Sequence, residues 1–126
     1  IESFRSGALI ICNTSGRGIE VRALSGWQIT TQQVASIRTS LMDLAVDGEV
    51  VLMNLNGRVG ACGPSIACVS SDLDPEDAKT FLGTLIVATK QVAIRDGISS
   101  APLLLSARGS TKIGERLLAC LAKQNK

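Results

Sequence analysis

The sequence predicts one α+β domain, built from a mainly antiparallel sheet of about five strands with helices packed on it. Three observations point to this class. The 126 residues suit a single domain with one core. A composition of 45% hydrophobic and 19% charged residues is typical of an ordered globular chain. Short apolar runs follow one another through turn signals, so we expect the order β-β-α-β-β-β-α-α across residues 1–126.

An N-terminal hairpin opens the predicted domain. Ala8 to Asn13 is an apolar, β-branched run. In Ile19 to Leu24 the apolar residues at positions 19, 21 and 23 alternate with Glu20, Arg22 and Leu24, a pattern close to that of a half-buried strand. The connection from Thr14 to Gly18 contains glycines but lacks the GK[ST] sequence of a P-loop. An ordinary turn therefore explains this connection better than a phosphate site.

The next element is predicted to be a helix from about Thr31 to Ala45. Thr30 precedes Gln33 by three residues, which is the capping-box spacing. Apolar residues then recur at helical spacing, at Val34, Ile37, Leu41 and Leu44. The Asp47-Gly48 pair that follows is a suitable stop for this helix.

The middle of the chain is predicted to form a meander of three strands. Glu49 to Leu55 and Arg58 to Cys62 flank Asn56-Gly57, a strong hairpin signal because both central residues of a type I′ turn need positive φ. Gly63-Pro64 interrupts the ladder, since proline lacks the donor that a central strand needs. Ser65 to Ser70 supplies the third strand.

A second helix is predicted from Asp74 to about Arg95. Asp74 is a good N-cap, Pro75 suits the first helical position, and acids follow beside the positive end of the helix dipole. Asp96-Gly97 supplies the stop. The acidic group does not have the spacing of an EF-hand loop, so capping explains it better than a divalent-metal site; its members are Asp72, Asp74, Glu76 and Asp77.

This second helix is predicted to be apolar on two sides. Phe81 belongs to a wide apolar face, while Val87 and Ile94, seven residues apart, add a ridge nearly opposite. Such a helix must be shielded from water on both sides. The second side would be covered either by the terminal helix and Leu103 to Leu105 or by a second subunit. The residues expected at an oligomer interface are Phe81, Val87, Ile94, Leu104 and Leu118.

The C-terminal part is predicted to hold an apolar linker or edge strand and a terminal helix. Ile98 to Leu105 contains Pro102, which a central strand would not accommodate. Ser110 caps a helix that runs to about Gln124. Its cations share one narrow sector beside an apolar stripe. A helix docked on the core with a solvated outer face explains this pattern more simply than a surface for nucleic acid, an acidic partner or anionic lipid.

Two groups of cations could bind an anion. The segment from Ala107 to Lys112 opens a helix whose free amides would face the anion, although capping by Ser110 accounts for the same residues without a ligand. In an oligomer, the arginines of the sheet could align with the basic terminal helix and contact phosphates. The candidate residues are Arg17, Arg22, Arg58, Arg108, Lys112, Arg116 and Lys123.

This chain has few of the residue combinations that catalyse reactions. The absence of histidine removes the commonest nucleophilic, acid-base and zinc arrangements, so we expect no enzyme, no cofactor and no metal. The four cysteines would permit two disulfides in a secreted protein. Because three of them lie inside apolar runs, we expect reduced, buried thiols instead. An enzyme that uses Cys62 or Cys68 as its nucleophile is the remote alternative.

Two functional hypotheses remain. The first is a non-enzymatic binding or scaffold module that self-associates, as a dimer or higher oligomer, and acts through protein–protein contacts. The second is a nucleic-acid-binding or viral-type structural protein that contacts phosphates, although a net charge of +2 does not by itself imply nucleic acid. No apolar run approaches the roughly 18 residues of a membrane span, so a cytoplasmic location is the default expectation.

Overall fold

The computed structural model describes residues 7–12, 16–24, 39–63, 66–96 and 102–124, with the side chains of residues 61–67 left undescribed. The described strands are β1 (Gly7–Cys12), β2 (Ile19–Leu24), β3 (Thr39–Val46), β4 (Glu49–Gly63), β5 (Ile66–Leu73), β6 (Gln91–Asp96) and β7 (Leu103–Ser106). The described helices are α2 (Pro75–Val87) and α3 (Ser110–Gln124).

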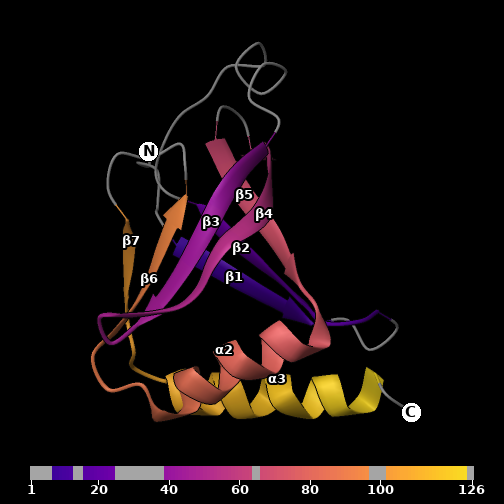
Figure 1. The fold of residues 1–126 in the computed structure, drawn as a ribbon, viewed down its shortest axis with the longest axis vertical. Helices are drawn as coiled ribbons and strands as arrows, with labels where there is room; N and C mark the ends of the chain where they lie inside the picture. The colour runs from indigo at the N-terminus through magenta and orange to yellow at the C-terminus, as the bar shows by residue number, and fades with distance from the viewer. Residues whose placement is uncertain (1–6, 13–15, 25–38, 64–65, 97–101, 125–126) are drawn as a thin grey trace.

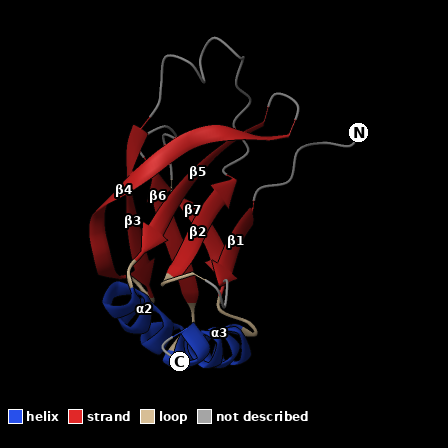
Figure 2. Ribbon diagram, turned by 90° about the vertical axis from the view of Figure 1, so that its right-hand side faces the viewer, coloured by secondary structure: helices blue, strands red, loops and turns tan. Residues whose placement is uncertain are grey.

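The seven strands form one antiparallel sheet in the order β1-β2-β5-β4-β3-β6-β7. The sheet curls until it is nearly barrel-shaped, as Figure 2 shows. Both helices lie together across one end of the curled sheet (Figure 1). The predicted α+β class with a mainly antiparallel sheet is confirmed, whereas the predicted strand number and order are wrong.

The N-terminal hairpin forms as predicted and continues the sheet through a long-range pairing. β1 pairs with β2 from Gly7 opposite Leu24 to Cys12 opposite Ile19. β2 then pairs with β5, which follows it much later in the chain. Alternate residues of β2 face inward and are buried, as its pattern of apolar and polar side chains predicts.

The predicted helix from Thr31 to Ala45 is wrong over its described part, because residues 39–46 form strand β3. Met42 and Leu44 are fully buried and Val46 nearly so, which is the alternation of a strand with one inward face. Asp47 and Gly48 have φ values of 52° and 86°, so this pair turns the chain into β4 instead of ending a helix. The first part of the predicted helix lies outside the described residues.

The predicted hairpin at Asn56-Gly57 is also wrong, since β4 runs unbroken through both residues. Gly57 is needed there for close packing: a Cβ at this position would lie 2.6 Å from the carbonyl oxygen of Ser40. β4 instead bends at register shifts in its pairing with β3, and Asn54 adopts a φ of 57° in this region. The long strand thus bends around the core as one element, visible in Figure 2.

Helix α2 begins as predicted and ends earlier than predicted. Asp74 is the N-cap, its carboxylate accepts the N–H of Asp77 at 2.8 Å, and Pro75 is the first helical residue. The N–H of Ala88 still donates to the carbonyl oxygen of Leu85 at 3.3 Å, but the amides that follow it turn away from the helix. The N–H groups of residues 89–91 donate to the carboxylate of Asp47 at 2.7–3.0 Å, so they cannot continue the helical ladder.

The segment predicted to complete this helix is strand β6, which pairs with β3 on one side and β7 on the other. Ile94 therefore faces the core between Leu44 and Leu103, at 3% exposure. For the segment from Ile98 to Leu105, the structure shows an edge strand from Leu103 onward, just after Pro102, and residues 98–101 lie outside the described residues. No ridge of Val87 and Ile94 exists on a helix, so the argument for a helix that must be covered twice is lost.

The terminal helix α3 has the predicted bounds and packs antiparallel to α2. A Cβ at Gly114 would lie 2.8 Å from the side chain of Ile86 and 3.1 Å from the carbonyl oxygen of Leu82, so the helices cross closely at this glycine. Thr111 donates its hydroxyl to the carbonyl oxygen of Ile86 at 2.8 Å. None of the described helices is long and apolar enough to cross a membrane.

The expectation of reduced thiols is wrong for Cys12 and Cys120, which form a disulfide between β1 and α3. Cys68 is also disulfide-bonded. An apolar run correctly places a cysteine near the core, but it does not reveal which other cysteine the fold brings alongside. Here the bonded residues are 108 positions apart in the sequence.

Candidate functional site

An apolar cavity lies where the curled sheet remains open. β1 and β7 are the two ends of the strand order, and in the described part of the chain neither has a second neighbouring strand. A cavity of about 330 Å³ is lined by both of these edge strands together with β2, β6, α2 and the start of α3. We call this opening between β1 and β7 the seam, and the space behind it the seam cavity.

The inner wall of the seam cavity is part of the hydrophobic core. Phe81 and Leu85 of α2 and Ile94 of β6 line it, and each is at most 3% exposed. From the edge strands come Ala8, Ile10 and Leu105, which are only partly buried and pack against the same core. These inward-facing residues of the edge strands are therefore incompletely covered because the sheet does not close over them.

Polar groups gather at one part of this cavity, where β7 leads into α3. Ser106, Arg108 and Ser110 all line it. The hydroxyl oxygen of Ser106 accepts the backbone N–H of Arg108 at 3.1 Å. The Arg108 side chain makes no ion pair with a described residue. Arg108 is the one charged residue among the described residues that line the cavity.

The predicted cap at Ser110 is wrong, and its hydroxyl is in an unusual position. Ser110 is the first residue of α3 and is 6% exposed, and its Oγ has no hydrogen-bond partner in the described structure. Its backbone N–H donates to the carbonyl oxygen of Ala107 at 3.0 Å. The turn is thus closed by the backbone, and the buried hydroxyl of this cavity-lining residue has no partner among the described residues.

Helix α3 spans the seam at the end of the sheet where the two helices lie. Its first residue follows β7 after a connection of three residues, 107–109, so its N-terminus is held close to that strand. Its other end is attached to β1 through the disulfide of Cys12 and Cys120. The side chain of Gln124 also accepts the N–H of Gly18 at 2.7 Å and donates to its carbonyl oxygen at 3.0 Å. The helix therefore connects both edges of the sheet.

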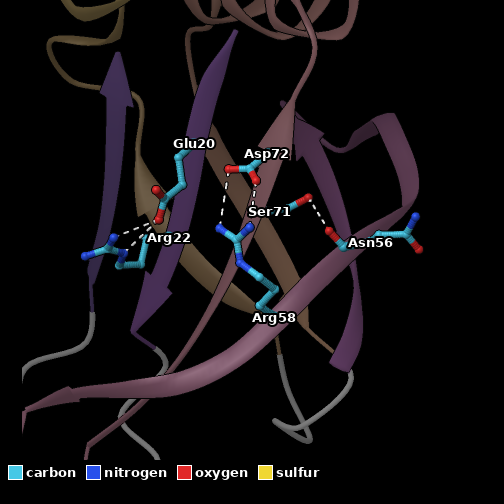
Figure 3. Close-up of polar contacts among 6 residues, drawn as sticks. All are labelled: Glu20, Arg22, Asn56, Arg58, Ser71 and Asp72. Carbon is cyan, nitrogen blue, oxygen red and sulfur yellow. Dashed lines mark hydrogen bonds and ion pairs between the residues drawn. The ribbon is translucent and has the colours of Figure 1, made fainter. Parts of the chain in front are cut away.

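A second hollow of about 600 Å³, lined by polar as well as apolar residues, lies on the outer face of the sheet. Arg22 and Arg58 both lie across from Ser70 of β5 and both line this hollow. Arg22 is paired with Glu20 at 2.8 Å and Arg58 with Asp72 at 2.8 Å, as Figure 3 shows. The hydrogen bonds and charge of Asp72 raise the pKa of Arg58 above its usual value. Two cations thus face two carboxylates, which leaves no net charge in this group.

The structure does not bring the predicted cations into one surface. Arg22 and Arg58 are together on the sheet, whereas Arg17 lies exposed in the β1–β2 connection next to the contact of Gly18 with Gln124. Arg108 belongs to the seam cavity. The remaining three are exposed along α3: Lys112, Arg116 and Lys123.

The residues predicted for an oligomer interface also separate. Phe81 and Ile94 are core residues, at 1% and 3% exposure, and are not available to a partner. Leu118 is partly buried against the core. Val87 at the end of α2 and Leu104 on the outer side of β7 are exposed, at 72% and 57%. They lie on different elements and do not form the expected ridge.

Sequence reasoning singles out one segment that lines the seam cavity, but it does not predict the apolar wall. It names the segment from Ala107 to Lys112, which contains Arg108 and Ser110, as one that could bind an anion, although it favours capping there. It misses the apolar wall, since no local signal tells that β1 and β7 flank one space. No family model, curated protein or solved structure matches the chain.

Proposed function

We propose that this protein is a non-enzymatic binding module that takes an apolar group into the seam cavity. The observation that carries this proposal is a space of about 330 Å³ that is lined by core side chains and by residues of both edge strands. Protein interiors normally contain few voids larger than a water molecule. Ligand pockets are mostly apolar, measure roughly 300–1,000 Å³ and contain few polar groups, which matches this cavity.

The direct test is calorimetric titration with 1-octanol, a neutral molecule small enough for the cavity. We expect saturable binding of one equivalent to the wild-type protein. Ala8→Phe should abolish it, because Ala8 lines the cavity and the added ring would occupy the space. Ala93→Phe is the matched control, since Ala93 lies on β6 with its side chain on the opposite face from the buried residues Val92 and Ile94.

Two results would contradict the proposal. One is the absence of saturable heat with the wild-type protein. The other is an equal loss of binding in Ala8→Phe and Ala93→Phe, because a general disturbance of the sheet would then explain both. The thermal midpoint of each variant, measured in the same buffer, separates a filled cavity from an unfolded protein.

Self-association is the second candidate, and it now rests on the edge strands. Leu9, Ile11 and Leu104 are 50%, 39% and 57% exposed on β1 and β7. An exposed apolar edge strand is a template for pairing with another chain. Light scattering after size exclusion tests this candidate: we expect a dimer or larger species that Leu104→Lys shifts toward monomer, and a strict monomer at high concentration contradicts it.

Phosphate-directed binding of nucleic acid receives less support. Arg22 and Arg58 have carboxylate partners within the sheet, so binding a phosphate there would require breaking an existing pair. The exposed cations of α3 are separated from them on another element. Retention on an RNA column at low salt, lost steeply as salt is raised, would revive this hypothesis.

We also propose an oxidising compartment in place of the cytoplasm. The disulfide of Cys12 with Cys120 and the bonded state of Cys68 support this proposal. Disulfides persist in oxidising environments and are rare in cytosolic proteins. Mass spectrometry of the protein from its native source, alkylated before reduction, should find these thiols blocked from alkylation, and free thiols would contradict it.

A further inference from the structure

The polar groups of the seam cavity indicate which apolar ligand it takes, an inference that rests on the proposed binding function. We infer that the ligand is a straight-chain amphiphile with one carboxylate head. Arg108 and Ser110 hold the head where β7 meets α3, and the tail lies against Phe81, Leu85 and Ile94.

Ser110 is the strongest reason to place a hydrogen-bonding group in this cavity. Buried hydroxyl groups in native proteins nearly always have a partner. The Oγ of Ser110 is buried and has none among the described residues, and Ser110 is one of the residues that line the cavity. The oxygen is not exposed to the cavity in this structure, so the side chain must turn about its Cα–Cβ bond before the hydroxyl can donate to an oxygen of a bound ligand.

Arg108 determines that the ligand oxygen carries negative charge. Arg108 is exposed and lines the cavity together with Ser110, and no described acidic residue lines the cavity with them. The first turn of α3 also contains no acidic residue, so the positive end of the helix dipole is not neutralised there. A guanidinium group, a hydroxyl and a helix start together favour an anionic oxygen over a neutral one.

The size of the cavity and its single cation restrict the ligand further. At about 30 Å³ for each non-hydrogen atom, the space of about 330 Å³ holds roughly ten of them. One guanidinium suits a singly charged carboxylate better than a dianionic phosphate, which would need more cationic partners. Because the remaining wall is apolar, the other atoms belong to a hydrocarbon chain. A medium-chain fatty acid has this size and chemistry.

Calorimetric titration with octanoate and 1-octanol, which have the same chain length, tests the head group. We expect the wild-type protein to bind octanoate at least about tenfold more tightly than 1-octanol. Arg108→Gln should bring the two affinities close together by weakening octanoate. Arg116→Gln is the matched control, because Arg116 is an exposed arginine of α3 that does not line the cavity.

Ser110→Ala tests the second contact and has a built-in control for folding. We expect octanoate to bind roughly threefold to tenfold more weakly in this variant. Its unfolding midpoint without ligand should not fall, since the hydroxyl makes no hydrogen bond with a described residue that could be lost. A fall in that midpoint would show that Ser110 has a structural partner, and would overturn its assignment to the ligand.

The remaining outcomes separate this inference from the proposed function. Equal affinities for octanoate and 1-octanol in the wild-type protein would overturn the carboxylate head while leaving the apolar site intact. An equal effect of Arg108→Gln and Arg116→Gln would also overturn it, because general positive charge would then account for the preference. Failure of both molecules to bind would instead reject the proposed function itself.

Discussion

Asp47 shows how one side chain can decide where two elements end. It occupies the left-handed position of the β3–β4 turn, with a φ of 52°. Its carboxylate accepts backbone N–H groups from Thr89, Lys90 and Gln91, at 2.7–3.0 Å. These hydrogen bonds, those from Thr89 and Lys90 above all, lower the pKa of Asp47 below its ordinary value of 3.8. The ionised carboxylate therefore holds the α2–β6 connection against the turn.

This linkage predicts how Asp47→Asn alters the dependence of stability on pH. Because the pKa is lower in the folded state, the carboxylate stabilises the fold fully above 3.8, and that contribution disappears as pH falls through the folded-state pKa. We expect Asp47→Asn to lower the free energy of unfolding at neutral pH and to approach the wild type in strong acid. Chemical denaturation at several pH values measures this.

Glu49→Gln is the control for that experiment, since Glu49 begins β4 in the same hairpin and makes none of the hydrogen bonds just described. It should not reproduce the pH-dependent difference. A constant gap between Asp47→Asn and the wild type at every pH would show that the charge of Asp47 is irrelevant, and only its hydrogen-bonding shape matters.

Among the elements, β4 depends on a glycine whose role is packing rather than turning. A Cβ at Gly57 would lie 2.6 Å from the carbonyl oxygen of Ser40 and 2.9 Å from a methyl group of Val69. We expect Gly57→Ala to lower the free energy of unfolding by about 1–3 kcal/mol, because backbone and core must move apart. Thermal and urea denaturation of the purified variant measure this loss.

Gly60 provides the comparison within the same strand. A Cβ there would meet nothing within 4 Å, so Gly60→Ala should be neutral or stabilise the protein by up to about 1 kcal/mol through reduced chain entropy. If Gly57→Ala were as stable as Gly60→Ala, Gly57 would not be a close-packing position in solution.

The sequence predicts both β3 and β6 as parts of helices, and the two wrong predictions have one physical cause. Leu41 and Leu44 are three residues apart and fit a helix, while Met42, Leu44 and Val46 alternate and fit a strand. Local spacing supports both interpretations. Pairing with β4 and β6 decides between them, and neither pairing is visible in a short window. The same holds for β6, whose apolar residues could have continued α2.

For the whole molecule, the fold class and the bounds of some single elements are easier to predict than the contacts between strands that are distant in the sequence. The hairpin of β1 and β2, the N-cap at Asp74 and the bounds of α3 follow from local patterns, and the structure confirms them. The seam cavity does not follow from them, since β1 and β7 are far apart in the sequence and meet only through the curl of the sheet. The sequence singles out Arg108 as a candidate residue, whereas the apolar wall beside it leaves no local signal.

The attachment of α3 to both edge strands gives the last prediction, which concerns the double variant Cys12→Ala/Cys120→Ala. The disulfide closes a loop across 108 positions, so its removal should lower the free energy of unfolding by about 2–5 kcal/mol. Urea denaturation measures this loss. Because the same bond fixes α3 to β1, the seam should also loosen and 1-octanol should bind more weakly in the variant that remains folded.

Alanine at the two cysteines leaves the bond of Cys68 in place, which reduction of the wild-type protein would not do. Weaker ligand binding with folding retained would mean that the covalent link sets the width of the seam. Unchanged binding together with lower stability would mean that Gln124, which contacts both Gly18 and the sulfur of Cys12, aligns the edge without the disulfide. Unchanged stability would show that the link does not hold the two edges together at all.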